Sequence, residues 1–314
     1  MDLKNRSILI TGATGFLGSH LTRRLARLGT KVHAWSATSS RLWRLADVKD
    51  QIALSQVDIR DLAQVRQACR SLQPELVFHL AAYGVNHDEK DIPTAVDVNV
   101  RGTTHLLEAL RGSGCRRIIT TGTWAEYGPK DHPARETDPL EPVGIYGCTK
   151  AAATTIALGI AAREKLPLIV LRPFSVYGPG EGSHKFVPIV IQACLKRESP
   201  RLTSCRQVRD YVYVEDVVEA YLRAAEADLS MPAVINIGSG SPVELKQIVS
   251  AVTAHFEGIQ PAFGAIPDRQ NEIWRIEADI TNAKKRLGWQ PAFPLEKGIA
   301  LTVDWFRKNT NGKN

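Results

Sequence analysis

A tyrosine and a lysine four residues apart, in the segment YGCTK, form the first pair in this chain that could do chemistry. On a helix predicted from about Tyr146 to Lys165, the spacing places the side chains of Tyr146 and Lys150 on one face. A phenol with an ordinary pKa of about 10 is a poor base at neutral pH, but a neighbouring ammonium group favours the phenolate. The pair could then exchange a proton with a hydroxyl or carbonyl group. Any helix can carry these residues by chance, so their meaning depends on the rest of the chain.

Three glycines, Gly12, Gly15 and Gly18, lie in TGATGFLGSHL, directly after the predicted strand SILIT and at the start of an amphipathic helix. Gly12 allows a tight turn, Gly15 lets backbone N–H groups approach a pyrophosphate, and Gly18 permits close helix packing. The N-terminus of the helix favours an anion. A strand-to-helix turn can need glycine for its own geometry, but this position in the first βα unit predicts dinucleotide binding. A dinucleotide site upstream makes the Tyr146 and Lys150 pair a candidate catalytic pair.

Charge limits the classes of ligand. The 40 Lys and Arg residues are interspersed with 33 Asp and Glu residues, which gives a formal net charge of +7 without a concentrated basic arm. Nucleic-acid binding is therefore not expected, whereas a modest positive field suits anionic small molecules such as nucleotides and sugar phosphates.

Cysteines and apolar runs indicate the compartment. The five cysteines are widely spaced and form no CxxC pair, so they predict neither a disulfide framework nor a zinc site and fit a reducing cytoplasm. No apolar N-terminal segment precedes the first strand, and no run approaches eighteen apolar residues. We therefore expect a cytoplasmic protein with no bound metal and no membrane span.

Short β-branched runs alternate with longer helical patterns in the first half of the chain. This alternation predicts parallel βαβ units, and strands this continuously apolar must be covered on both faces. The fold class is predicted as α/β, a doubly wound (Rossmann) parallel sheet with a smaller interleaved C-terminal lobe. Strands are expected at 7–11, 31–35, 51–58, 75–82, 116–122, 167–173, 210–214 and 234–240, and helices at 15–28, 62–72, 94–111, 146–165, 187–197 and 244–255.

The regular pattern is lost after Pro173, where Gly, Pro and charged residues mix in YGPGEGSHKFVP. We assign residues 1–174 to a Rossmann dinucleotide-binding domain that takes later strands from about 207–238. Residues 175–206 and 239–314 are assigned to a substrate-binding lobe.

The glycine spacing GxxGxxG differs from the common GxGxxG fingerprint and resembles that of the extended short-chain dehydrogenase/reductase family. This family includes epimerases, dehydratases and ketoreductases that modify nucleotide sugars. The resemblance continues, in the family's order from residue 8 to about 290, through VDIRD (57–61), HLAA (79–82), VNVRGT (98–103), YGCTK (146–150), LRPFSVYGPG (171–180) and VRDYVYVEDV (208–217). It implies an NAD(P)-dependent enzyme and covers nearly the whole chain.

The resemblance also implies which residues line the cofactor. Asp58 and Ile59 would contact the adenine, and Ala81 and Ala82 would lie along the dinucleotide. Together with the residues argued from chemistry, the expected cofactor site consists of Gly12, Gly15, Phe16, Leu17, Gly18, Ser36, Arg41, Asp58, Ile59, Leu80, Ala81, Ala82, Thr121, Lys150, Pro173 and Val176.

The end of the second predicted strand bears on the choice between NAD and NADP. NAD enzymes of this fold usually have a carboxylate there that accepts hydrogen bonds from the adenosine ribose. That position is Ser36, and the next acid is Asp47, whereas Arg41 and Arg44 follow on the loop. A small hydroxyl with guanidinium groups suits a 2'-phosphate, although these arginines could instead be solvated surface residues. NADP(H) is therefore expected, with NAD(H) as the alternative.

The segment TTGTWAEYGP contributes the third expected catalytic residue. The family uses a Ser or Thr four residues before the Tyr of a YG pair, which here is Thr123 with Tyr127 as the landmark. The resemblance implies that the Thr123 hydroxyl hydrogen-bonds the reacting oxygen, so the catalytic set is Thr123, Tyr146 and Lys150. Sugar 4,6-dehydratases carry an acid two residues before the landmark tyrosine. That place is Ala125 here, and the acid stands at Glu126 with a role, structural or substrate-binding, that the sequence leaves open.

The resemblance also implies a nucleotide-diphosphate sugar as substrate. Arg209 and Arg269 match arginines that hold the diphosphate in the family, and two bidentate charges would anchor that part of the substrate. Ser175 replaces a usual Asn, so the pocket is altered. Substrate contacts are therefore expected at Thr123, Trp124, Ser175, Arg209 and Arg269.

Three functions are open at this point. The favoured one is an NADPH-dependent reduction of an NDP-4-keto-6-deoxysugar at C4, with Tyr146 as proton donor, because Ser36 is no acid and Ala125 removes the dehydratase base. The alternative is a nucleotide-sugar 4-epimerase with tightly bound NAD. A non-catalytic nucleotide-binding protein would not need Thr123, Tyr146 and Lys150 together. The apolar helices at 94–111 and 146–165 also predict a homodimer.

Overall fold

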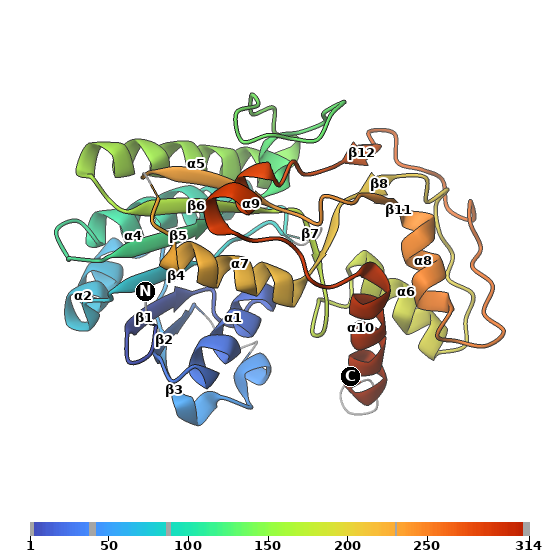
Figure 1. The fold of residues 1–314 in the computed structure, drawn as a ribbon, viewed down its shortest axis with the longest axis horizontal. Coiled ribbons are helices and arrows are strands. Elements are labelled where there is room, and N and C mark those ends of the chain that lie inside the picture. Colours follow the sequence, from blue (N-terminus) through green and yellow to red (C-terminus); the bar gives the residue numbers. More distant parts are fainter. Residues whose placement is uncertain (1–2, 38–41, 86–88, 230, 310–314) are drawn as a thin grey trace.

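The computed structural model of the protein describes residues 3–37, 42–85, 89–229 and 231–309. Within these residues, seven parallel strands form the main sheet in the order β10-β6-β5-β4-β1-β2-β3 (Figure 1). The predicted doubly wound α/β sheet is confirmed. Its strands are β1 (Ser7–Thr11), β2 (Lys31–Ser36), β3 (Ile52–Gln56), β4 (Leu76–His79), β5 (Arg117–Thr121), β6 (Leu168–Pro173) and β10 (Ala233–Ile237).

Helices cover both faces of this sheet (Figure 1). One layer consists of α1 (Phe16–Arg27), α7 (Val214–Glu226) and α9 (Thr281–Leu287). The other consists of α2 (Leu62–Leu72), α4 (Gly102–Ala109) and α5 (Gly144–Glu164). Short helical turns complete the main domain: η1 (Leu42–Leu45), η2 (Lys49–Gln51), α3 (Ile92–Ala95), the π-helical turn η3 (Val96–Arg101) and η4 (Trp124–Glu126).

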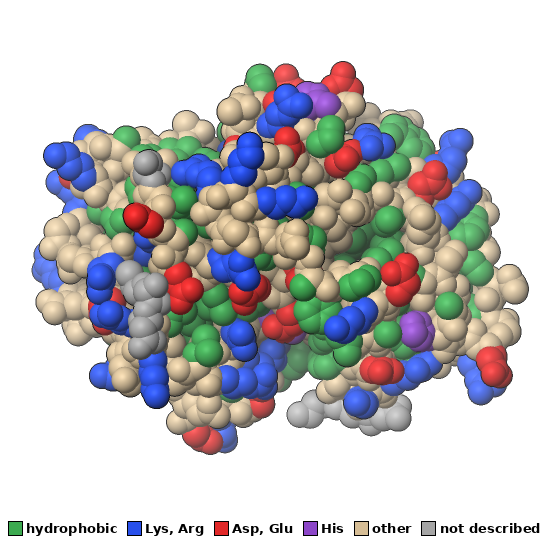
Figure 2. Space-filling view, viewed as in Figure 1, with side chains coloured by type: hydrophobic (Ala, Val, Ile, Leu, Met, Phe, Trp, Pro, Cys, Tyr) green, Lys and Arg blue, Asp and Glu red, His purple; other side chains and the backbone are tan. Residues whose placement is uncertain are grey.

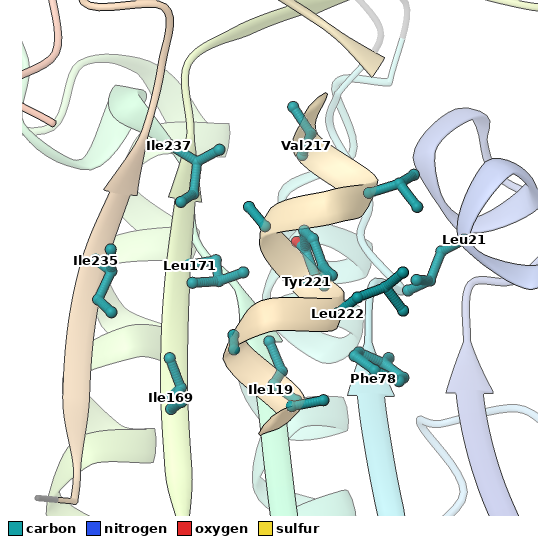
Figure 3. Packing of buried hydrophobic residues seen from close by; sticks show 14 of the residues in the cluster. Leu21, Phe78, Ile119, Ile169, Leu171, Val217, Tyr221, Leu222, Ile235 and Ile237 are labelled. Atoms are coloured by element: carbon teal, nitrogen blue, oxygen red, sulfur yellow. The ribbon is translucent and has the colours of Figure 1, made fainter. Parts of the chain in front are cut away.

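Successive strand residues point alternately into the two helix layers. In β1, Ile8 and Ile10 belong to the cluster that includes α1 and α7, whereas Leu9 belongs to the cluster that includes α2 and α4. All three side chains are fully buried. Figure 3 shows Val217 and Tyr221 of α7 packed over the neighbouring strands of the first cluster. Because both faces are buried, these strands read as continuous apolar runs.

The smaller lobe has its own apolar core. It contains α6 (Phe186–Leu195), α8 (Leu245–Thr253) and α10 (Leu295–Asn309), which bury Val190, Val249 and Val303 against one another (Figure 1). Two small sheets lie between the lobe and the main domain. One pairs β7 (Ser175–Tyr177) with β9 (Tyr211–Tyr213), and the other has the order β11 (Val243–Glu244), β8 (Val208–Arg209), β12 (Arg275–Ile276).

The structure refines the expected use of residues 207–238. Only β10 of this stretch joins the main sheet, while β8 and β9 belong to the small sheets. Helix α7 is missing from the sequence predictions, although it forms the centre of one helix layer. It starts at Val214 directly after β9, with no Gly or Pro between them and no side-chain cap. The segment DYVYVEDVV is rich in valine and tyrosine on both sides of the boundary, so its composition does not separate the strand from the helix.

Helix α5 differs from the expectation that no apolar segment approaches membrane-spanning length. Among the described residues it is the helix that is long and apolar enough to cross a membrane by length and composition alone. Its buried side chains, which include Ala151, Ala157 and Ala161, pack against the main domain. We interpret α5 as a core helix with an unusually small and apolar composition.

Candidate active site

The candidate site lies at the carboxyl edge of the main sheet, where β1, β4 and β5 end side by side. The chain runs from β1 to β2 and β3 on one side and then crosses to β4, β5 and β6 on the other. Ligands of doubly wound sheets bind outside the strand ends at such a switch point. The glycine loop, HLAA and the segment that contains Thr123 follow these three strands.

The glycine loop leaves room for a ligand at the start of α1. Gly12 has a φ of +69°, which favours glycine, and a Cβ there would lie 2.6 Å from the backbone nitrogen of Ala81. A Cβ on Gly18 would collide with the carbonyl oxygen of Gly12. Gly15 is the N-cap of α1 without a side-chain cap bond, and the first turn holds no acid. The free N–H groups and helix dipole therefore fit a pyrophosphate.

The other residues expected at the cofactor surround this loop. Thr11 accepts a hydrogen bond from the Ala81 backbone N–H through Oγ1 (3.3 Å). The Thr121 hydroxyl lies 2.6 Å from the hydroxyl of Tyr221 on α7, so it already has a protein partner. The remaining positions follow the strand order: Phe16 and Leu17 begin α1, Leu80 and Ala82 follow β4, Pro173 ends β6, and Val176 lies in β7.

The adenosine end of the expected site is held by hydroxyl and guanidinium groups. Ser36 ends β2, and its Oγ lies 3.1 Å from Oγ1 of Thr14 in the glycine loop. Arg44 is buried and donates to the carbonyl oxygens of Thr14 (3.4 Å) and Gly180 (3.1 Å). Arg44 thereby braces the glycine loop, which is a different use from the 2'-phosphate contact considered for it. Arg41 lies outside the described residues.

Asp58 and Ile59 follow β3 in two different environments. Ile59 is buried, and a Cβ on Gly102 would come within 2.6 Å of its Cδ1, so the glycine of VNVRGT makes room for it. Asp58 is partly exposed and accepts from Arg60 (2.6 Å), and this hydrogen bond lowers the pKa of the Asp58 carboxyl. Asp58 therefore stays ionised and can accept hydrogen bonds from a ligand.

The structure brings the three expected catalytic residues together. Thr123 follows β5 as the N-cap of η4, and Tyr146 and Lys150 lie one turn apart on α5. Burial raises the pKa of Tyr146, and a hydrogen bond with Thr123 opposes that rise. Burial lowers the pKa of Lys150, and the charge of Glu126 opposes that fall. Thr123 and Tyr146 therefore share a hydrogen bond beside a buried ammonium group.

Glu126, whose role the sequence leaves open, points into the protein. Its side chain is fully buried and forms an ion pair with Arg172 of β6 (2.8 Å). It also accepts from the Thr123 backbone N–H (2.9 Å) and completes a capping box around η4. Ala125 has no carboxylate, and the carboxylate of Glu126 is engaged with Arg172 and the Thr123 backbone inside the protein.

Asn99 is a site residue that the sequence reasoning did not single out. It is fully buried at the π-helical turn η3, accepts from the Tyr83 N–H and donates to the Tyr83 carbonyl, both at 2.9 Å. It also donates to Thr149 Oγ1 (2.9 Å), which precedes Lys150 on α5. Asn99 thus fixes α5 against the loop after β4. The motif VNVRGT, in which it lies, is the signal that could have identified it.

Of the expected substrate residues, Ser175 and Arg209 lie in the small sheets between the main domain and the smaller lobe. Ser175 in β7 is paired with Tyr211 in β9. Arg209 is mostly buried and bonded to Glu272 (2.8 Å). Burial lowers the pKa of Arg209, Glu272 opposes this change, and Arg269 adds to it, so the two arginines share one electrostatic environment.

Two neighbours of these residues were not predicted. Glu272 orients Arg209 and partly neutralises it. Asp210 is fully buried and accepts from the backbone of Ser239, Gly240 and Ala278, which ties the start of β9 to the segments after β10 and β12. Trp124 is the first residue of η4 and packs at the margin of the main core. Among the described residues, no cluster of His, Cys, Asp and Glu could hold a metal ion.

His79 connects the strand ends through a hydrogen-bond chain with one direction. The Thr103 hydroxyl donates to the Asn99 carbonyl (2.6 Å), so Thr103 accepts from His79 Nε2 (2.9 Å). The Thr11 hydroxyl lies 2.6 Å from His79 Nδ1, which accepts from it when Nε2 carries the only ring proton. This pattern needs a neutral imidazole. Burial, assisted by the charge of Lys150, lowers the pKa of His79 from 6.5 to about 3.

We expect His79 to make the fold less stable as the pH falls from 6.5 towards 3. In this window the unfolded state binds a proton that the folded state excludes, so the free energy of unfolding falls by up to about 1.4 kcal/mol per pH unit. In a His79→Gln variant this part of the slope disappears. Urea unfolding of both proteins between pH 7 and pH 4 measures the difference, and parallel slopes would contradict the neutral assignment.

Comparison with known proteins agrees with this geometry. Residues 8–238 match the model of the NAD dependent epimerase/dehydratase family. The UDP-glucose 4-epimerase of Mycolicibacterium smegmatis is 33% identical over 313 residues, which span 96% of this chain and 99% of that protein.

Solved structures give the same result. The UDP-glucose 4-epimerase of Thermotoga maritima with UDP-glucose superposes with a TM-score of 0.88 at 31% identity and covers 96% of this chain and 99% of its own. The UDP-glucose 4-epimerase of Thermus thermophilus in complex with NAD gives a TM-score of 0.85, also at 31% identity, with coverage of 96% and 99%. This chain therefore belongs to the NAD-dependent epimerase/dehydratase family and is a nucleotide-sugar enzyme of the extended short-chain dehydrogenase/reductase type.

Proposed function

We propose that this protein is a nucleotide-sugar 4-epimerase that works with bound NAD. The observation that carries the proposal is the arrangement of Thr123, Tyr146 and Lys150 at the sheet edge, combined with the absence of an acid at Ala125 and the inward direction of Glu126. Dehydration would need a base at that place, whereas epimerisation at C4 needs only the three residues present. Relatives above 30% identity over nearly the whole chain carry the name UDP-glucose 4-epimerase.

The cofactor cradle supports a dinucleotide. Gly12, Gly15 and Gly18 let the loop pack closely on its own backbone and on Ala81, which brings the uncapped start of α1 to the sheet edge, where it suits a pyrophosphate. When bound there, the nicotinamide would supply the temporary acceptor for the hydride of the sugar C4. NAD is proposed because the structures of relatives contain it.

The protein's own residues would handle the proton of the sugar C4 hydroxyl. Tyr146 as phenolate would accept it during oxidation and return it to the ketone oxygen during reduction. Lys150 would stabilise the phenolate through its charge, which matters because burial alone raises the pKa of Tyr146. Thr123 would hold the same oxygen through its hydroxyl.

The lobe would hold the nucleotide half while the sugar turns over. Inversion at C4 needs the ketosugar to present its other face, so the diphosphate must stay anchored while the sugar rotates. Arg209, fixed by Glu272, and Arg269 are the proposed anchors. The substrate class is a nucleotide-diphosphate sugar, for which UDP-glucose in a structural relative is the first candidate.

A second function is favoured by one observation. Ser36 ends β2 where NAD enzymes usually have a carboxylate, which leaves room for the 2'-phosphate of NADPH. With that cofactor the same residues would reduce an NDP-4-keto-6-deoxysugar at C4, and Tyr146 would donate the proton. Arg44, now engaged with backbone carbonyls, supports this reading less than its position in the sequence suggested.

Replacement of the proposed proton carrier tests the mechanism. In Tyr146→Phe we expect kcat to fall by about 10²–10⁴, the usual contribution of general acid–base catalysis, while UDP binding and thermal stability change little. The matched control is Tyr213→Phe in the core of the lobe, which should retain full turnover. Near-normal turnover of Tyr146→Phe would exclude the proposed role.

Analysis of the co-purifying cofactor distinguishes the two functions. The epimerase proposal predicts that the denatured protein releases stoichiometric NAD and that the native protein interconverts UDP-glucose and its C4 epimer without added cofactor. Liquid chromatography of the released nucleotide and of the sugar products measures both. A cofactor-free protein that oxidises added NADPH only with a 4-ketosugar would establish the reductase instead.

We also propose that the protein forms a homodimer through α5 and the segment before α4. Ile145 and Ile156 of α5 and Ile92 and Val96 near η3 are between 38% and 53% exposed, and the elements that carry them pack against one another. Sedimentation velocity should give twice the mass of one chain, and Ile156→Glu should give the monomer. A monomeric wild-type protein at micromolar concentration would exclude the dimer.

A further inference from the structure

Both oxygens of the buried Glu126 carboxylate are occupied by residues from three different elements. Oε1 accepts from the Thr123 backbone N–H (2.9 Å) after β5 and from the Thr154 hydroxyl (3.1 Å) on α5. Oε2 accepts from Nε of Arg172 (2.8 Å) on β6. Glu126 therefore joins the strand end that carries Thr123 to the helix that carries the other catalytic residues.

The Glu126 carboxylate is closely packed against Gly122 and Arg172. A Cβ on Gly122 would lie 2.6 Å from Glu126 Oε1 and 2.8 Å from Arg172 Cγ. The far side of Arg172 donates to the Tyr127 hydroxyl (2.8 Å) and stacks over its ring (4.6 Å). Tyr127 in turn donates to Asn236 (2.7 Å). The guanidinium is thus held away from the site, and the negative end of the ion pair faces Thr123 and α5.

The catalytic residues of α5 lie on the same face of the helix as Thr154, which binds Glu126. Tyr146, Lys150 and Thr154 follow each other at intervals of four residues, so they lie along one face of α5. Glu126 binds the third member of this row, and Lys150, one turn away, is 5% exposed. A buried ammonium needs a compensating charge, and the carboxylate of Glu126, which binds Thr154 one turn further along the same face of α5, can supply that charge.

We propose that Glu126 is a positioning residue of the active site, which locks Thr123 against α5 and provides the counter-charge that keeps Lys150 an ammonium. The proposal rests on the proposed function to the extent that Tyr146 and Lys150 act on a sugar oxygen. It also assigns a role to Glu126, the acid of TWAEYG, which follows directly after Ala125, the position where dehydratases carry their acid.

The electrostatic effects have a defined direction. Burial lowers the pKa of Lys150, and Glu126 raises it. The other titratable group from a neighbouring element that faces Lys150 is His79 of β4, which is neutral. Glu126 also raises the pKa of Tyr146. Loss of the Glu126 charge therefore lowers the pKa of both residues, and the field of Arg172 acts in the same direction if that side chain remains.

Tyr146 has further neighbours besides Glu126. Glu89 raises its pKa from the loop after β4, and Tyr221 of α7 lies close enough to be affected by it. The side-chain partners of Glu126 do not include these two residues, so they remain constant when Glu126 is replaced. Thr123 also hydrogen-bonds Tyr146, and because Glu126 holds the Thr123 backbone, this hydrogen bond is part of what the replacement tests.

The decisive variant is the double replacement Glu126→Gln with Arg172→Met. A single Glu126→Gln leaves the buried Arg172 without a counter-charge and is expected to be unstable, whereas removal of both charges restores much of the stability. The double variant should keep the substrate KM within about threefold but lose at least tenfold in kcat, and both limbs of its pH profile should move to lower pH. A wild-type kcat and profile would overturn the proposal.

A second pair of variants tests the link to α5 without a change of charge. Thr154→Val removes the hydroxyl that donates to Glu126 and should lower kcat a few-fold at constant KM. The matched control is Thr155→Val, because the exposed Thr155 hydroxyl donates only to Ala151 within its own helix. Equal kcat values for the two variants would overturn the positioning role, even if the double variant fails to fold.

Titration of Lys150 separates this inference from the proposed function. NMR of protein with ¹³C-labelled lysine, with the Lys150 signal assigned by Lys150→Arg, follows its deprotonation without any substrate. The midpoint should fall in the double variant. If no sugar nucleotide is turned over by the wild type, the proposed function fails while this measurement still stands. An unchanged Lys150 midpoint would refute the counter-charge.

Discussion

A parallel sheet whose inner strands are buried on both faces is the constraint on which this protein depends. The crossovers force helices onto each side, and the apolar strands pack between α1 and α7 on one face and α2, α4 and α5 on the other (Figure 1, Figure 3). Because all strands run the same way, their carboxyl ends meet at one edge. The loops that carry Gly12, Ala81 and Thr123 are neighbours for this reason and need no further device to bring them together.

The same edge must bury polar groups, and here the chain satisfies them with chains of hydrogen bonds. His79 joins Thr11 to Thr103, Asn99 joins the loop after β4 to α5, and Glu126 joins Thr123 to β6 and α5. A buried polar group without a partner is costly, so each link restricts the backbone to one arrangement. The catalytic residues are held rigidly because their supports are buried and paired.

Polar and charged side chains hold the cofactor end and the substrate end, and several of them, including Ser36, Arg44 and Arg209, are themselves largely buried. On the face shown in Figure 2, basic and acidic side chains are intermixed, in keeping with a ligand held by a few placed arginines and not by a broad basic surface. Ser36 bonds the glycine loop through Thr14, and Arg44 braces it from outside. Family membership favours NAD, while Ser36 keeps NADP open, because a small residue excludes neither ribose nor phosphate.

The sequence by itself determined the fold class, the glycine loop and the pair of Tyr146 and Lys150, since these depend on local periodicity and on spacing along one helix. It could not reveal α7, which starts without a punctuating residue after β9. Nor could it decide the role of Glu126. The conformation of η4 determines whether the side chain of Glu126 points towards a ligand or into a buried ion pair. Only the tertiary structure placed Arg172 and Thr154 within reach of that carboxylate, as contacts between residues far apart in the chain arise from strand order and helix packing.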